Sequence, residues 1–252
     1  MIASRPEGKQ VKTFFKASLF ALLYFSSFVV LGNDSSSAAK ARCVSPWLEI
    51  EANGKAQGFP AENICERASW AIDQMELCGF SIQQKLTVEV VDELKHPCGL
   101  PVVGYFDSVE FRVKVASPDQ CRQLLLAEAA LANADFDAVY GSIIVHEVVH
   151  AALWSQLQNS EHEPIPAMAT EYVAYAFQVM SLPEPDRDSL LAAFPRATPK
   201  DLGPFNYTAL QISPLLFATN AYKHLMSVDN RCHFLKEIIS GKVEFDDWYE
   251  YE

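Results

Sequence analysis

The segment HEVVH, residues 146–150, holds the side chains best suited to chemistry. Residues four apart lie on one face of a helix, so His146 and His150 can both direct a ring nitrogen at one metal ion. Glu147 lies about a third of a turn away, which keeps it off the ion but close to a water bound there. A general base requires that position. The segment therefore predicts a metal site that activates water, with zinc as the expected ion.

The residues around the two histidines and Glu147 strengthen the prediction, because nearly all of them are apolar. They are Ile143, Ile144, Val145, Val148, Val149, Ala151, Ala152 and Leu153. Three ionisable groups in so apolar a helix are costly unless something compensates their polarity, and a metal ion does so. Two other interpretations stay open, since the three groups could be hydrogen-bonded core residues or an exposed polar stripe.

A catalytic zinc usually has three protein ligands and a water, so one more ligand is required. The pattern HExxHxxGxxH is absent, since Leu153 and Gln156 occupy the positions of its glycine and third histidine. We predict Glu171 as the third ligand, because its neighbours in the next helical segment are mostly apolar and a carboxylate there needs a cation. His162 or Glu163, in the intervening loop, is the alternative ligand, and Glu171 would then be an ordinary exposed glutamate.

The segment His146-Glu147-Val148-Val149-His150, with Glu171-Tyr172-Val173-Ala174 downstream, resembles the gluzincin branch of zinc metallopeptidases. The resemblance covers residues 141–180, and it implies a Zn²⁺ cofactor and a peptide or protein substrate. These enzymes share an HExxH helix and a second helix bearing ExxD or ExxA. Ala174 stands where many members have an aspartate that orients a zinc-bound histidine, so that role is unassigned here.

The resemblance also implies a sheet whose edge strand binds an extended substrate by backbone pairing. Residues 102–106 (VVGYF) or 109–115 (VEFRVKV) could be that edge, although each also fits an ordinary core strand. Such an enzyme needs a side chain near the metal that stabilises the transition state. The candidates, among which no spacing selects, are Tyr175, Tyr207, Tyr222, His224, Arg231 and His233.

The elements expected to position these groups are mainly strands in the first half of the chain and helices in the second half. Alternating apolar residues predict strands at 47–52, 85–91 and 109–115, with a helix at 63–77. The connection at 96–105, rich in proline and glycine, could add a short edge strand. The first half of the chain therefore predicts a small sheet.

Beyond Pro118 the pattern is helical. Helices are expected at 120–132, 136–157 and 167–180, the last with Pro166 in its first turn. Residues 182–205 read as an irregular segment with one short helix, and two more helices are expected near 206–227 and 229–240. The helix over 136–157 is so apolar that it must be buried on nearly every side.

The N-terminus predicts export. Residues 1–16 carry four basic side chains and residues 17–32 carry no charge, as in a secretory signal. Cleavage is expected before Arg42 or, as an alternative, after Ala39. An uncleaved anchor is the other interpretation, but the run is shorter than the ~20 apolar residues of a membrane span. The protein is thus expected to be periplasmic or secreted, with no stable membrane anchor.

The cysteines agree with an oxidising compartment, because their number is even and all lie beyond the expected cleavage site. They are Cys43, Cys65, Cys78, Cys98, Cys121 and Cys232. Three disulfides are expected, and the sequence leaves their pairing open. A net charge of −12 repels phosphate backbones, so nucleic acid is not an expected partner.

The sequence as a whole predicts an α+β, zincin-like catalytic domain over residues 42–252, after a signal peptide at 1–41. Residues 42–135 would form a lobe containing the sheet, and 136–252 a helical lobe that carries the metal. The expected activity is that of a zinc metallopeptidase, with His146, His150 and Glu171 as ligands and Glu147 as base. The alternative is an envelope protein that uses the same ligands for a structural or sensory metal.

Overall fold

A mixed five-stranded sheet forms one side of the protein in the computed structural model, which describes residues 39–52, 59–96, 99–125, 128–158, 166–195 and 198–245. The strand order is β1-β2-β3-β5-β4. The three inner strands are parallel, and the two edge strands run antiparallel to their neighbours. The strands are β1 (Ala39–Arg42), β2 (Leu48–Ala52), β3 (Leu86–Val91), β4 (Gly104–Asp107) and β5 (Arg112–Ala116).

Alternation of side chains gives the sheet one apolar and one charged face. In β3, Leu86, Val88 and Val90 are buried, whereas the residues between them are only half buried. On the charged face Arg112 of β5 lies 3.2 Å from Glu89 of the neighbouring β3 and 2.6 Å from Glu51 of β2, one strand further. The apolar face must therefore be covered by other elements.

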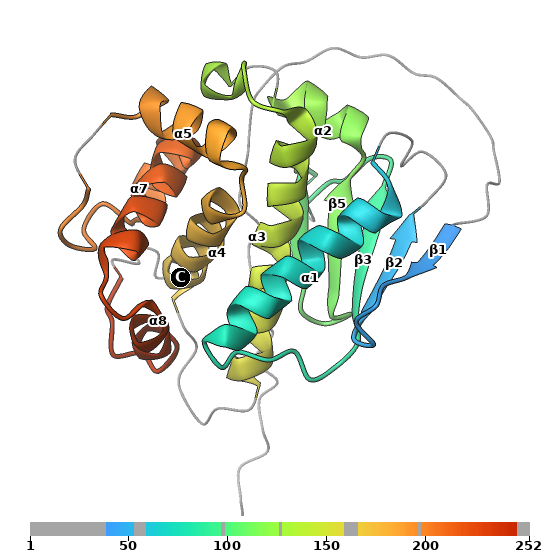
Figure 1. Cartoon of the computed structure of the whole chain (residues 1–252), viewed down its shortest axis with the longest axis horizontal. Helices are drawn as coiled ribbons and strands as arrows, with labels where there is room; N and C mark the ends of the chain where they lie inside the picture. The colour runs from blue at the N-terminus through green and yellow to red at the C-terminus, as the bar shows by residue number, and fades with distance from the viewer. Residues whose placement is uncertain are drawn as a thin grey trace, which may run out of the picture.

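Two helices cover that face, as Figure 1 shows: α1 (Ala61–Leu77) and α3 (Phe136–Leu157). Helix α3 contacts α1 and strands β4 and β5, and it contacts α4 (Ala167–Met180) on its other side. Sixteen of its residues are buried, so it is the central element of one continuous hydrophobic core. Helix α3 is long and apolar enough to cross a membrane, but 83% of its apolar 18-residue stretch is buried inside the protein, as expected of a core helix.

Helices α4, α5 and α7 lie beyond α3, on the side away from the sheet, whereas α2 contacts both α3 and strand β5 (Figure 1). Helix α4 packs against α3 and α7, while α5 packs against the 3-10 turn η1 (Ala129–Leu131). The other bounds are α2 (Pro118–Leu125), α5 (Glu184–Ala193), α6 (Tyr207–Ile212), α7 (Pro214–Ser227) and α8 (Arg231–Ile239). The protein is thus α+β, with a small sheet and a mainly helical remainder.

Several predicted elements have different bounds in the structure. The helix expected at 120–132 ends at Leu125, and η1 follows a short gap. The strand expected at 109–115 begins at Arg112, because Phe111 has a φ of 49° in the turn after β4. The helix expected near 206–227 is two helices, because Pro214 begins a new one after the extended Ser213. Helices α3 and α4 have the predicted bounds.

Two disulfides join cysteines among the described residues, which fits an oxidising environment. Cys43 is bonded to Cys65 of α1, and Cys78 at the end of α1 is bonded to Cys232 of α8. The expectation of three disulfides is wrong for Cys121, which is a free, fully buried thiol. It packs between α2 and the sheet, with its sulfur 3.6 Å from the carbonyl oxygen of Ala116. Cys98 lies outside the described residues.

Residues 1–38 of the expected signal segment lie outside the described residues. Residues Ala39–Arg42 pair with β2 as the edge strand β1, so cleavage before Arg42 would remove most of this strand. Cleavage after Ala39 would retain three of its four residues.

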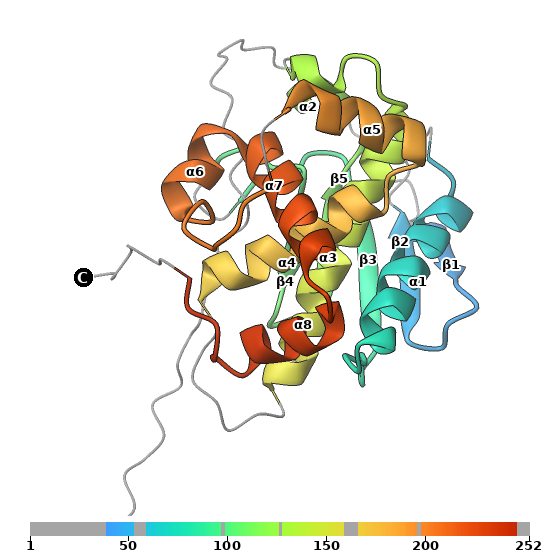
Figure 2. The ribbon, with the colours of Figure 1, turned by 60° about the vertical axis from the view of Figure 1, so that its left-hand side comes forward.

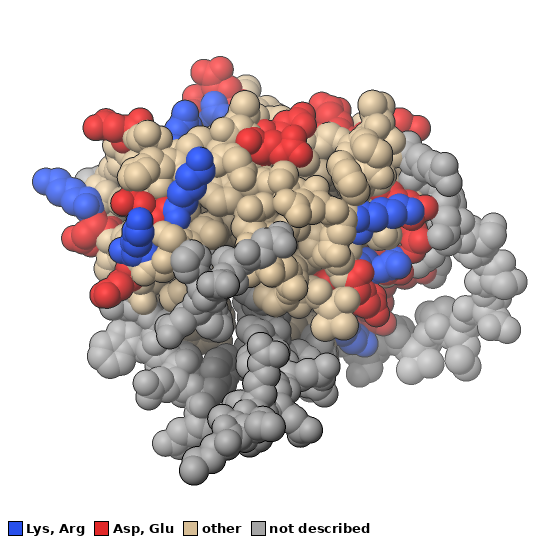
Figure 3. Space-filling view, turned by 90° about the horizontal axis from the view of Figure 1, so that it is seen from below, with Lys and Arg blue, Asp and Glu red and all other residues tan. Residues whose placement is uncertain are grey.

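Figure 3 shows side chains of both charges around the border of a broad uncharged area on one face. The net negative charge is therefore not gathered into one patch on that face.

Candidate metal centre

The two helices that carry the predicted ligands lie side by side. Helix α3 begins after Asp135, whose side chain accepts a hydrogen bond from the backbone N–H of Asp137. Helix α4 begins after Pro166, which is the N-cap residue rather than part of the first turn as predicted. Both helices are almost wholly buried along their contact. Any polar group in that contact must find its partner within the protein or in a bound ion.

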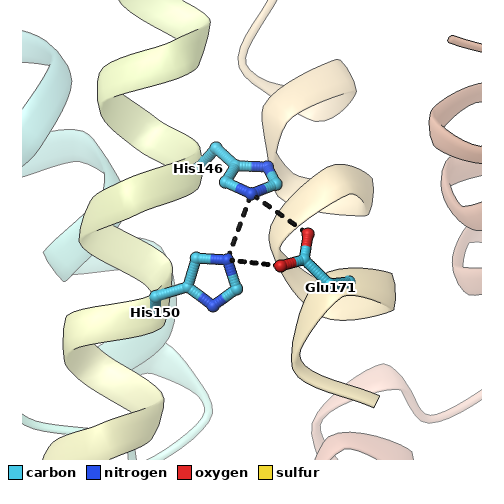
Figure 4. Close-up of side chains that lie close together, drawn as sticks. All are labelled: His146, His150 and Glu171. Carbon is cyan, nitrogen blue, oxygen red and sulfur yellow. Dashed lines mark hydrogen bonds and ion pairs between the residues drawn. The ribbon is translucent and has the colours of Figure 1, made fainter. Parts of the chain in front are cut away.

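His146, His150 and Glu171 point toward one another across this contact (Figure 4). The Nε2 atoms of the two histidines are 3.1 Å apart. Oε2 of Glu171 is 3.5 Å from Nε2 of His146, and Oε1 is 3.5 Å from Nε2 of His150. His146 and Glu171 are 4% and 5% exposed. This buried group can hold a metal ion.

The electrostatics of the two histidines differ. Burial lowers the pKa of His150 to about 4, although the charge of Glu171 opposes the shift. Burial also lowers the pKa of His146, but its hydrogen bond with Glu171 and the charges of Glu147 and Glu171 outweigh burial and raise the pKa overall. His150 is therefore a neutral imidazole at pH 7, the form in which histidine binds a metal.

Glu147 lies on the same helix but faces the edge strand β4. A Cβ atom at Gly104 would lie 2.9 Å from Cγ and from Oε1 of Glu147. The Glu147 carboxylate also accepts a hydrogen bond from the backbone N–H of Phe106. Burial raises the pKa of Glu147 to about 7, and Glu171 adds to the shift while His146 and Phe106 oppose it. A carboxylate with a pKa near 7 can both accept and release a proton at neutral pH.

Gln178 is a polar partner of the site that the sequence did not predict. Its Oε1 accepts a hydrogen bond from Nδ1 of His146 at 3.0 Å. Its Nε2 faces Oγ of Ser142 at 3.5 Å, and that hydroxyl donates to the carbonyl oxygen of Val139 at 2.7 Å. With Nδ1 held by Gln178, Nε2 is the ring nitrogen of His146 that remains to bind a metal ion, and it lies beside Glu171 and His150.

A sequence signal for Gln178 did exist. It follows Glu171 by seven residues, so the two share one face of α4. Tyr175 lies between them on that face, and its ring packs edge-on against His146 with centroids 4.5 Å apart. Helix α4 thus brings three polar side chains, Glu171, Tyr175 and Gln178, into contact with histidines of the HEVVH segment.

The other predicted candidates have different surroundings. His224 of α7 is buried among aromatic rings, where its Nδ1 lies 2.7 Å from the hydroxyl of Tyr172. His233 of α8 is paired with Glu237 at the surface. Tyr175 alone among the six candidates shares a pocket with His146 and Glu147. His162 and Glu163, the alternative ligands, lie outside the described residues.

Comparison with known proteins identifies the family of this chain. The chain belongs to a family described as a family of unknown function (DUF6639), which matches residues 52–248. The match covers α1 to α8, the four strands after β1 in part or whole, and every residue of the site. No curated protein and no solved structure matches the chain.

Proposed function

We propose that this protein is an exported zinc-dependent hydrolase that cleaves peptide bonds. The observation that carries the proposal is the buried group of His146, His150 and Glu171, with a fourth ionisable residue, Glu147, directed toward the edge strand beside it. A metal that only stabilised the fold would have no need of Glu147. The presence of a buried carboxylate there therefore favours catalysis.

The spacing of the donor atoms supports zinc. In a tetrahedral site with bonds of about 2.0–2.1 Å, the donors lie about 3.4 Å from one another. The two Nε2 atoms are 3.1 Å apart, each lies 3.5 Å from a different oxygen of Glu171, and the three donor atoms, one per residue, all lie within 4.8 Å of one another. The set of two imidazoles and one carboxylate also suits zinc and leaves a fourth position for water or substrate.

Each residue of the site has a proposed task. Zinc, when bound, would act as a Lewis acid toward the substrate carbonyl and make a bound water more acidic. Glu147 takes a proton from the attacking water and delivers it to the leaving amine, which its pKa of about 7 permits. Tyr175 is the candidate for donating a hydrogen bond to the developing oxyanion, because it lines the same pocket as Glu147.

Strand β4 is suited to bind an extended peptide. It is an edge strand, so one side of its backbone is not paired within the sheet. Of the two segments that the sequence suggested for this role, 102–106 supplies the edge, whereas 109–115 supplies β5, which lies between β3 and β4. Because Gly104 touches Glu147, a peptide paired with β4 would pass close to the proposed base.

Elemental analysis and a peptide-cleavage assay test the proposal together. The purified protein is expected to contain one zinc per chain and to cleave peptides in a randomised library. The Glu147→Gln variant should retain zinc and lose cleavage, while His150→Ala should lose both. Glu66→Gln, an exposed substitution on α1, is the matched control and should change neither.

Two results would contradict the proposal in different ways. Absence of stoichiometric metal in the wild-type protein would remove the metal site itself. A zinc-loaded protein that cleaves no peptide, and whose Glu147→Gln variant behaves identically, would favour the alternative of a structural or sensory metal.

A further inference from the structure

An apolar pocket adjoins the proposed catalytic residues on one side only. His146 and Glu147 line it, and the remaining lining residues of α3 precede them in the sequence, whereas His150 and Glu171 do not line it. The pocket therefore extends from the site toward the N-terminal end of α3. Figures 1 and 2 show α2 and α5 together at that end of the molecule.

The pocket is lined from seven elements, β4, α2, η1, α3, α4, α5 and α7, or from residues directly beside them. Its aliphatic lining includes Leu125, Leu131, Leu190 of α5 and Ala218 of α7. Leu190 is the buried residue of α5, and Ala218 is 2% exposed. Such a pocket lined by aliphatic groups favours an aliphatic occupant, because each buried methylene removes apolar surface from water.

Away from the end next to the proposed metal, the pocket offers no charge to balance a charged occupant. Glu147 and His146, at the end next to the proposed metal, are its ionisable lining groups apart from the phenol of Tyr175. A lysine, arginine or aspartate side chain that reached the aliphatic walls would lose its hydration without gaining a partner. Charged side chains are therefore excluded.

The size of the pocket excludes aromatic side chains as well. Its free volume is about 40 Å³. A cavity needs about 10–15 Å³ of such volume to hold one water, and a cavity that admits benzene measures about 150 Å³. The space is thus too small for a phenyl ring but sufficient for one or a few methyl groups.

We propose that this pocket is a specificity subsite, which accepts a small neutral aliphatic side chain, alanine or valine, next to the scissile bond of the substrate. The inference rests on the proposed peptidase function, since it adds the substrate class to the same site. Binding there would hold the adjacent peptide group against His146 and Glu147.

Cleavage of a randomised peptide library, with the new termini read by mass spectrometry, tests the subsite. Alanine and valine are expected at one position flanking the cleaved bond, about tenfold or more above phenylalanine, lysine and aspartate. Leu190→Ala should enlarge the pocket and shift the preference toward leucine or phenylalanine. Ala218→Val should fill it and shift the preference toward glycine and alanine. The proposal is overturned if neither variant changes the preference.

A matched control separates the pocket from general loss of packing. Leu235 of α8 is 1% exposed and does not line the pocket. Leu235→Ala removes the same atoms from the core as Leu190→Ala, but it should leave the preference unchanged. A shift of the same kind in Leu235→Ala would overturn the assignment.

A binding measurement distinguishes failure of the subsite from failure of the peptidase proposal. N-acetylvalinamide should shift the methyl resonances of Leu190 and Leu215 in metal-free protein, N-acetylphenylalaninamide should not, and Ala218→Val should abolish the shift. Selective binding by a protein that cleaves nothing would support an aliphatic site and contradict only the peptidase. Cleavage without side-chain preference, together with no methyl shift, would overturn the subsite and leave the peptidase standing.

Discussion

Replacing Gln178 with alanine is expected to weaken zinc binding by about ten- to a hundredfold. Gln178 accepts the hydrogen bond from Nδ1 of His146 at 3.0 Å, which fixes the ring orientation and leaves Nε2 free to bind the ion. His146 is 4% exposed, so water cannot readily replace the lost acceptor. The variant must bind zinc with a histidine that is free to rotate or to protonate Nε2 instead.

The same change should lower the stability of the metal-free protein by about 1–3 kcal/mol, because a buried N–H group loses its partner. Zinc affinity is measured by competition with a chelator, and stability by urea unfolding with the metal removed. The absorption spectrum of the Co²⁺-loaded protein reports the ligand geometry and should also change. These three readouts do not require a known substrate.

Gln178→Met is the control for packing, because methionine has a similar length but accepts hydrogen bonds only weakly. It should weaken zinc binding about as much as Gln178→Ala. Gln178→Glu restores an acceptor and should bind zinc at least as tightly as the wild-type protein. If the methionine variant binds zinc like the wild-type protein, the hydrogen bond does not position His146, and the reasoning is refuted.

Three further predictions follow from other contacts. Gly104→Ala should push Glu147 aside, since the new Cβ would lie 2.9 Å from its Cγ, and cleavage should fall by up to about a hundredfold while zinc content is unchanged; wild-type cleavage rates would contradict this. Burial lowers the pKa of His224 below 6.5, so the unfolded chain binds the proton first and stability falls as the pH drops through about 6.5. Urea unfolding at about pH 7.5 and 5.5 should show a smaller loss for His224→Asn, and an equal loss would refute the assignment. The Cys78–Cys232 disulfide spans 154 residues, and its replacement by two alanines should lower the unfolding free energy by about 4–5 kcal/mol, measured by thermal unfolding; an unchanged midpoint would contradict that estimate.

The sequence by itself determined the features that depend on local spacing. The bounds of α3 and α4 were predictable, because apolar periodicity, Asp135 and Pro166 mark helices within a few residues of chain. The pairing of His146 with His150 follows from helix geometry alone. Glu171 was predictable because a carboxylate among apolar helix residues needs a partner, although its distance from the histidines was not.

Only the tertiary structure decided the contacts between elements distant in the chain. Glu171 lies 3.5 Å from both histidines only because of how far α3 and α4 are shifted along their axes relative to each other. Side-chain packing along the whole contact between the two helices sets that shift. The same packing selects Gln178 rather than residue 174 as the partner of His146. The close contact of Gly104 with Glu147 and the free state of Cys121 likewise depend on how α3 and α2 lie on the sheet. Periodicity specifies which face of a helix is buried, but not which residue of a neighbouring element lies opposite it, so these contacts could not be predicted from the sequence.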